Sequence, residues 1–234
     1  MLIFSQLWVA LDMSIGTVKL SSFSVTHHIM VALLSLLRVV RCFLCNLCLI
    51  GKVHIMSRVS LLEEKDHPEL KDPIAKIRGE RGGRLLNIFQ MLLHSPSLAM
   101  AWLEQVSAVR WKTQLSGQIR ELVILRVGII NRVDYIFKAH VPAYTHKEGL
   151  SLAQCNAIVV WRSSDLFDAA QCAALEYADA MTLDIQVSDA VFQKLKPHFT
   201  ERQIVELTVL IATYNMHNRV LEALKIDPTV SHQD

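Results

Sequence analysis

The feature that most constrains the fold is a series of residues suited to start helices, each followed by an apolar run with helical spacing. Five such residues precede runs of this kind: Ser116, Ser151, Asp168, Ser188 and Thr200. Their side-chain oxygens can accept hydrogen bonds from the free N–H groups of a first helical turn. Gln154 and Gln203 complete capping boxes with Ser151 and Thr200. No segment alternates apolar and polar residues between hairpin turns, as strands would, so the sequence predicts an all-α fold.

Several of the expected helices are strongly apolar. Residues 84–94 place apolar side chains at helical spacing, and Ser95 with Pro96 predicts the start of the next helix. The runs 116–131 and 200–224 are apolar almost all round, and the first is expected to be a central buried helix. Two such helices are hard to cover within one small chain, which predicts a homo-oligomer. Three large aromatic side chains are expected to anchor the core or an interface: Trp102, Trp111 and Trp161.

Residues 1–55 differ in composition from the remainder, so two regions are expected, 1–55 and 56–234. The first carries four Lys or Arg and one Asp, a net charge of +3, whereas the second sums to −1. The stretch 29–50 is about long enough to cross a bilayer, but Arg38 and Arg41 within it would be costly at the membrane centre. Three interpretations of this apolar N-terminal extension stay open: it is disordered, it adheres to a membrane, or the true start is Met56.

The charge balance also limits the partners. A net charge of −1 over residues 56–234 lacks the basic face that nucleic-acid binding requires. Membrane contact is expected only through residues 29–50, and the expected location is the cytoplasm. No cofactor and no metal site are predicted. Cys42, Cys45 and Cys48 have the spacing of an iron–sulfur fragment but no fourth ligand nearby.

Four segments, in order, carry a resemblance to a known family: RELVILRVG, DYIFKAHVPAYTHKEGLS, LFDAAQCAALEYADAMT and ERQIVELTVLIATYNMHNRVLEAL. Over about residues 57–227 the chain resembles the carboxymuconolactone decarboxylase-like family, to which alkylhydroperoxidase D belongs. The resemblance implies an all-helical, alkylhydroperoxidase D-like domain that assembles into trimers or hexamers.

Redox-active members of that family use a Glu, a Cys-x-x-Cys pair twelve residues later, and a His four residues beyond the second Cys. Matched onto this chain, the Glu is Glu121 and the His is His140, whereas the two cysteine positions hold Val133 and Ile136. A peroxidatic thiol must ionise, and a partner thiol must close the disulfide. The sequence therefore predicts that the protein is not a thiol peroxidase.

Glu121 and His140 are the predicted catalytic residues. We expect them to meet in a partly buried pocket, because one helix can end near Asn131 and the next can fold back along it. Such a pair suits proton transfer, since burial raises a carboxyl pKa and a histidine titrates near neutrality. The resemblance implies a lyase or isomerase that acts by acid–base steps on an unsaturated or aromatic-derived acid.

Six further residues are predicted to bind this small acidic substrate: Val133, Asp134, Tyr135, Ile136, Lys138 and His217. Val133 and Ile136 are expected to form apolar walls that raise the pKa of Glu121. Lys138 or Arg126 is expected to hold the acidic group.

Alternative interpretations stay open beside this one. Glu121 in so apolar a helix is also explained by a buried ion pair with Arg120 or Arg126. In that case the protein is a non-catalytic oligomeric binding protein, with Ile136 filling the space between Glu121 and His140. A third alternative is a peroxidase that uses displaced cysteines. Cys155 and Cys172, however, lie on different expected helices and are interpreted as core residues.

Overall fold

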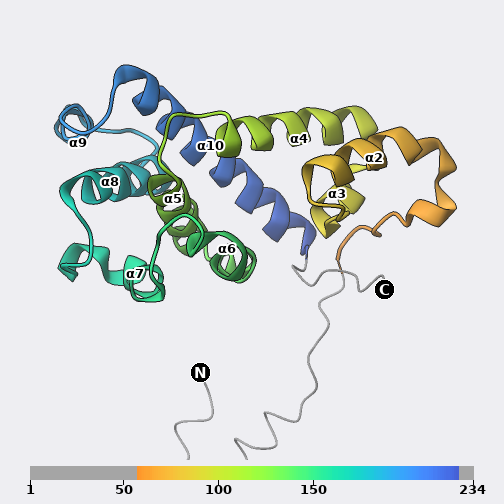
Figure 1. Ribbon diagram of the computed structural model, residues 1–234, viewed down its shortest axis with the longest axis horizontal. Helices are drawn as coiled ribbons and strands as arrows, with labels where there is room; N and C mark the ends of the chain where they lie inside the picture. Colours follow the sequence, from red (N-terminus) through yellow and green to blue (C-terminus); the bar gives the residue numbers. More distant parts are fainter. Residues whose placement is uncertain (1–56, 227–234) are drawn as a thin grey trace, which may run out of the picture. The chain divides into compact units, whose positions relative to one another are not determined.

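The computed structural model describes residues 57–226, and every described element is helical (Figure 1). The predictions for residues 1–55, including their boundary with the helical domain, lie outside the described residues. The elements follow in this order: η1 (Glu64–Asp66), η2 (Pro68–Leu70), α2 (Lys71–Glu80), α3 (Asn87–Leu92), α4 (Pro96–Trp111), α5 (Gly117–Ile130), α6 (Asp134–His140), η3 (Val141–Thr145), α7 (Leu152–Ala157), η4 (Ile158–Ser163), α8 (Ala169–Leu183), α9 (Asp189–Gln193) and α10 (Glu201–Leu224). The predicted all-α class is confirmed.

The predicted helix starts are largely confirmed by the hydrogen bonds at each first turn. Ser116 accepts a hydrogen bond from the backbone N–H of Ile119, and Ser188 caps α9 in the same way. Capping boxes start α7, α8 and α10. Ser95 is the exception, because it precedes α4 but its side chain makes no capping hydrogen bond. Pro96, whose backbone has no N–H to satisfy, starts that helix instead.

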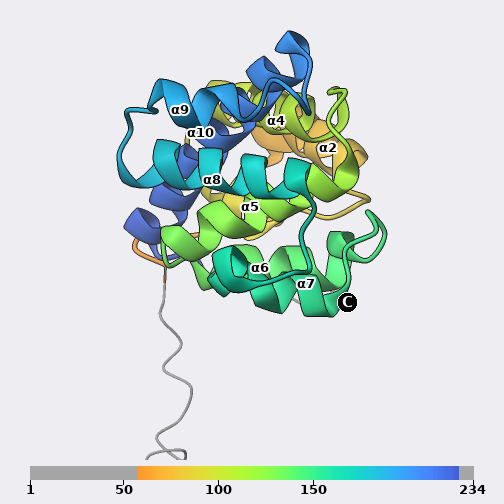
Figure 2. The same cartoon turned by 90° about the vertical axis from the view of Figure 1, so that its left-hand side faces the viewer.

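Helix α5 is the centre of the core, as its apolar sequence predicts. It packs against α8, α10 and α6, and Figure 2 shows it running between α8 on one side and α6 with α7 on the other. Its residues from Ile119 to Leu125 are all buried. The expectation that α5 needs a second chain to cover it is therefore wrong. Helix α10, in contrast, leaves Val205, Val209 and Met216 exposed.

The turn between α5 and α6 brings the two helices back along each other. Asn131 ends α5, and its side-chain amide donates to Val127 O in the same helix and to Asn215 Oδ1 in α10. Arg132 then adopts the left-handed conformation, with φ of 60°, and the Val133 N–H donates to Gly128 O. Because of this reversal, α6 runs beside the middle of α5.

The large aromatic side chains divide between core and surface. Trp102 and Trp161 are buried, as expected, but Trp111 is 46% exposed at the end of α4. Within the described part of the chain, no helix is both long and apolar enough to span a bilayer.

Candidate active site

Glu121 in α5 and His140 at the end of α6 are in direct contact. The Nδ1 atom of His140 lies 2.6 Å from Oε2 of Glu121. The Glu121 side chain has no exposed surface, and His140 is 6% exposed. The juxtaposition that the nineteen-residue spacing predicts is therefore present. The catalytic role of the pair stays a prediction.

Two arginines face the second oxygen of the Glu121 carboxylate. Arg110 Nη2, from α4, lies 3.5 Å from Oε1, and Arg120 Nε lies 3.7 Å from the same atom. Arg120 also pairs with Glu148 at 2.7 Å, so its charge is shared between two carboxylates. Sequence reasoning named Arg120 but missed Arg110, because no local pattern links α4 to this site.

The charges around the pair determine its protonation. Burial raises the pKa of Glu121, but the hydrogen bond and charge of His140 and the charges of Arg110 and Arg120 outweigh it, so the pKa lies below its usual range. The prediction that apolar walls raise this pKa is wrong, because the hydrogen bond from His140 and the nearby charges together outweigh burial. Burial lowers the pKa of His140, and the two arginines lower it further against the opposing effect of Glu121.

At neutral pH the pair is therefore a carboxylate beside a neutral imidazole. A neutral imidazole carries one N–H, and the 2.6 Å contact assigns it to Nδ1, which donates to Glu121. The other ring nitrogen, Nε2, then keeps its lone pair. This is the arrangement of a base that an anion orients.

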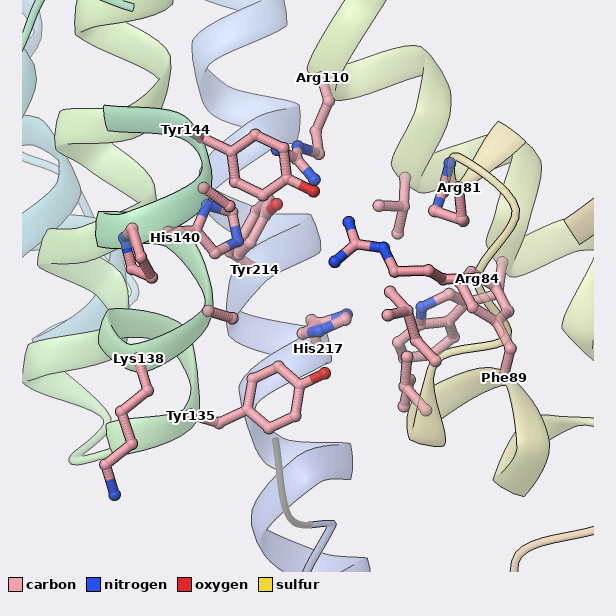
Figure 3. Close-up of a pocket in the computed structure, with 17 residues that line it drawn as sticks. Arg81, Arg84, Phe89, Arg110, Tyr135, Lys138, His140, Tyr144, Tyr214 and His217 are labelled. Atoms are coloured by element: carbon pink, nitrogen blue, oxygen red, sulfur yellow. The ribbon is translucent and has the colours of Figure 1, made fainter. Parts of the chain in front are cut away.

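A cavity of about 380 Å³ lies beside His140, between α6 with η3 and the segment from α2 to α4 (Figure 3). Its charged and ring-bearing lining residues are Arg81, Arg84, Phe89, Trp102, Arg110, Tyr135, Lys138, His140, Tyr144, Tyr214 and His217. No Asp or Glu of residues 57–226 lines it. The cavity therefore combines aromatic walls with an excess of positive charge.

Comparison with known proteins agrees with this architecture. Residues 96–180 match the sequence profile of the Carboxymuconolactone decarboxylase family. The chain is 30% identical over 145 residues to the uncharacterized protein YnjA of Escherichia coli (strain K12), covering 62% of this chain and 74% of that relative. The chain belongs to the carboxymuconolactone decarboxylase/AhpD-like family.

Solved structures of related proteins show the same fold. A protein of unknown function from Agrobacterium tumefaciens, named as a putative antioxidant defence protein AhpD, is 29% identical with a TM-score of 0.56. That match covers 60% of this chain and 97% of the relative. A variant of the debrominase Bmp8, in complex with 2,3,4-tribromopyrrole, is 19% identical with a TM-score of 0.62, over 74% of this chain and 92% of that one. At this identity the second match shows the fold alone.

In this family member, three of the six predicted substrate-binding residues line the cavity beside His140. Tyr135 and Lys138 reach it from α6, and His217 reaches it from α10 (Figure 3). The His217 ring centre lies 5.6 Å from that of Trp102 and 5.7 Å from that of Tyr214. Burial first, and then the charges of His140, Arg110 and Arg81, lower the pKa of His217 to about 3. His217 is thus neutral at physiological pH.

The other three predicted residues lie elsewhere. Val133 and Asp134 line a second cavity, of about 400 Å³, which also involves Phe137 and Cys155. The Asp134 side chain is exposed and lies 3.8 Å from the Lys138 ammonium group. Ile136 is buried in the core and lines neither cavity. The prediction that these three residues line the cavity beside His140 is wrong, because Val133 and Asp134 lie at the opposite end of α6 and Ile136 is buried in the core.

Arg126 does not line the cavity beside His140 either. Its guanidinium makes two hydrogen bonds to the buried Asp179 of α8, from Nε to Oδ1 and from Nη2 to Oδ2. Arg162 and the indole N–H of Trp161 donate to the same carboxylate. This cluster joins α5, η4 and α8 and lies apart from the cavity beside His140.

The cysteines of the described region are separate, unpaired thiols. Cys155 on α7 is buried and Cys172 on α8 is partly buried. Burial raises the pKa of each thiol above its usual value. Raised values disfavour the thiolate that attacks a peroxide.

Proposed function

We propose that this protein is an enzyme that moves protons on a small unsaturated or aromatic-derived acid, as a lyase or isomerase. The observation that carries the proposal is the position of His140. One ring nitrogen contacts a buried carboxylate at 2.6 Å, and the same residue lines a cavity that the substrate can enter. A base oriented by a carboxylate beside a ligand cavity is the minimum arrangement for general acid–base catalysis.

In this mechanism Nε2 of His140 accepts a proton, and the Nδ1–H stays bonded to Glu121. The imidazolium that forms is stabilised by the Glu121 carboxylate, while Arg110 keeps that carboxylate ionised. In an isomerisation, the proton leaves one carbon of the substrate and returns to another. In a decarboxylation, the bond to the departing CO₂ breaks, its electron pair stays on carbon, and His140 delivers a proton taken from water.

The cavity supports an acidic substrate of modest size. Its volume of about 380 Å³ is near the lower limit of small-molecule sites, which span roughly 300–1,000 Å³. Positive side chains favour an anion, and the rings of Phe89, Trp102 and Tyr214 favour a flat, unsaturated body. A debrominase of the same fold has been solved with a small halogenated aromatic ring, which is consistent with a ligand of this class.

The proposal is tested by screening the full chain against small unsaturated and aromatic acids. Acids that raise the melting temperature are then assayed for turnover. Glu121→Gln and His140→Gln should each lower the rate by roughly two to four orders of magnitude, because each removes part of the proton-transfer machinery. Both variants should keep the parental helical circular dichroism.

The same experiment distinguishes the proposed enzyme from the alternative of a non-catalytic binding protein. In that case acids still stabilise the parent, no acid is consumed, and both variants bind as the parent does. Parental turnover rates in both folded variants would mean that the buried pair only supports the structure.

A further inference from the structure

One wall of the cavity includes part of a stack of alternating aromatic rings and guanidinium groups, in which Trp111 lies between two arginines that line the cavity. The guanidinium carbon of Arg81 lies 5.3 Å from the ring centre of Phe89 and 4.9 Å from that of Trp111. The guanidinium carbon of Arg110 lies 4.7 Å from Trp111 and 4.1 Å from Tyr144. These cation–π contacts fix both arginines in place, and they do not cancel the charges.

Carboxylates neutralise the two stacked arginines only in part. Glu80 lies 3.9 Å from Arg81 and also accepts a hydrogen bond from Ser107. Arg110 faces Glu121 at 3.5 Å, and that carboxylate is shared with other partners. Burial and then the like charge of Arg110 lower the pKa of Arg81. Two buried, mutually repelling cations are costly, and an added anion would relieve that cost.

Arg84 adds a third positive charge to this wall. It follows the turn after α2, is exposed, and lines the cavity. No ion pair or hydrogen bond joins its guanidinium to any other residue of the described region. In Figure 3, Arg81 and Arg84 lie across the cavity from Tyr135 and His140. Lys138, which reaches the cavity from α6, already lies 3.8 Å from Asp134.

We propose that Arg84, backed by the fixed charges of Arg81 and Arg110, is the subsite that binds the carboxylate of the substrate. Arg84 is the exposed guanidinium able to form a two-pronged contact with a carboxylate. The two buried arginines supply a positive field that does not depend on side-chain motion. This inference rests on the proposed function in its choice of ligand. It adds an orientation, with the acidic group at the arginine wall and the flat body of the substrate extending toward His140.

The test uses two probes of nearly equal shape, benzoate and its uncharged counterpart benzamide. Titration of the full chain by calorimetry should show benzoate binding that weakens with added salt, with benzamide bound at least about tenfold more weakly. Arg84→Gln should lose about tenfold in benzoate affinity and leave benzamide unchanged. Arg84→Lys should keep part of the benzoate affinity, because the positive charge remains but the guanidinium that makes the two-pronged contact is lost.

Arg132→Gln is the matched control, because it removes the same charge from the second cavity. It should bind benzoate as the parent does. Equal benzoate affinity in Arg84→Gln and the parent would overturn the assignment. So would equal affinity of the parent for the two probes, or no benzoate binding at millimolar concentration.

Different experimental results would contradict the subsite and the proposed catalytic function. His140→Gln should still bind benzoate with the parental dependence on Arg84, because that contact lies on the opposite wall. If binding follows these expectations and no acid is ever turned over, the subsite stands and the catalytic proposal fails. If acids are turned over at the parental rate by Arg84→Gln, with unchanged KM, catalysis stands and the subsite is wrong.

Discussion

Ile136 of α6 packs directly against the backbone of α5 at Gly128. A Cβ atom added at Gly128 would lie 2.8 Å from the Cβ of Ile136, closer than two such carbons can approach without movement. The family resemblance matches Ile136 to the second position of a cysteine pair, and in the structure this side chain joins two helices. This contact fixes α6 beside α5 and thereby places His140 against Glu121.

Gly128→Ala should therefore destabilise the protein. We expect the free energy of unfolding to fall by about 1–3 kcal/mol, the usual cost of overpacking a core. Chemical denaturation followed by circular dichroism measures this change. Gly79→Ala is the matched control, since an added Cβ there meets no atom within 4 Å, and it should be neutral or slightly stabilising. Equal losses in the two variants would contradict the close contact.

Arg110→Gln should raise the pKa of both Glu121 and His140. The positive charge of Arg110 lowers both values, so its removal favours protonation of each group. The other charged or titratable groups around His140 are Arg120, Tyr144, Tyr214 and His217. NMR titration of labelled histidines measures the change without any substrate.

Arg120→Gln is the control for this titration. Its guanidinium is 3.7 Å from Glu121 and is also paired with Glu148, so the upward shift of His140 should be smaller. Arg110→Lys should restore part of the parental value. An unchanged His140 titration in folded Arg110→Gln would show that Arg110 does not set the protonation of the pair.

The protein should lose stability as pH falls below about 6.5, partly because of His217. Its pKa is about 3 in the folded chain, against 6.5 for the free side chain, so the unfolded chain binds the proton more readily. The stabilisation is complete above 6.5 and is lost as pH falls toward the folded value. His217→Gln should reduce the slope between pH 6.5 and 4.5 by about 1.4 kcal/mol per unit. Denaturation at several pH values gives that slope, and equal slopes in parent and variant would refute it.

The full chain should show no thiol-dependent peroxidase activity. The Cys155→Ser/Cys172→Ser double variant should consume peroxide no more slowly than the parent, because both thiols have raised pKa values. A coupled peroxide assay with a dithiol reductant measures this. Turnover that vanishes in the double variant would show that displaced cysteines have taken over. Turnover lost only on replacing Cys42, Cys45 and Cys48 would place it in residues 1–55.

The protein should sediment as a trimer or a multiple of one. The family resemblance implies such an assembly. Helix α10 supports it, because Val205, Val209 and Met216 form an exposed apolar stripe spaced by four and seven residues. Val209→Glu should shift the assembly toward the 26.5 kDa monomer, whereas Glu201→Gln, also exposed on α10, should not. A parent that sediments only as a monomer at micromolar concentration would contradict the prediction.

The sequence alone determined the helices and the catalytic candidates. Capping residues such as Ser116 and Thr200 act on backbone groups within the next three positions, so their effect is local and can be predicted from the sequence. The spacing from Glu121 to His140 was informative because a single turn at Asn131 folds one helix back along the other. The family resemblance marks Glu121 and His140 as the catalytic candidates.

Only the tertiary structure decided what surrounds that pair. Arg81, Arg84 and Arg110 come from segments distant in sequence from α6, and no periodic pattern predicts that they line the same cavity as His140. For the same reason the predicted direction of the Glu121 pKa shift is wrong, because that shift depends on the hydrogen bond of His140 and on arginine charges that packing brings close. Val133 and Ile136 share a short stretch with His140, yet Val133 lies at the other end of α6 and Ile136 packs against α5 at Gly128, so neither lines the cavity. Hydrogen bonds between neighbours in sequence can be predicted from the order of the residues. The electrostatic field at a site, in contrast, sums the contributions of all charges that lie near it in space.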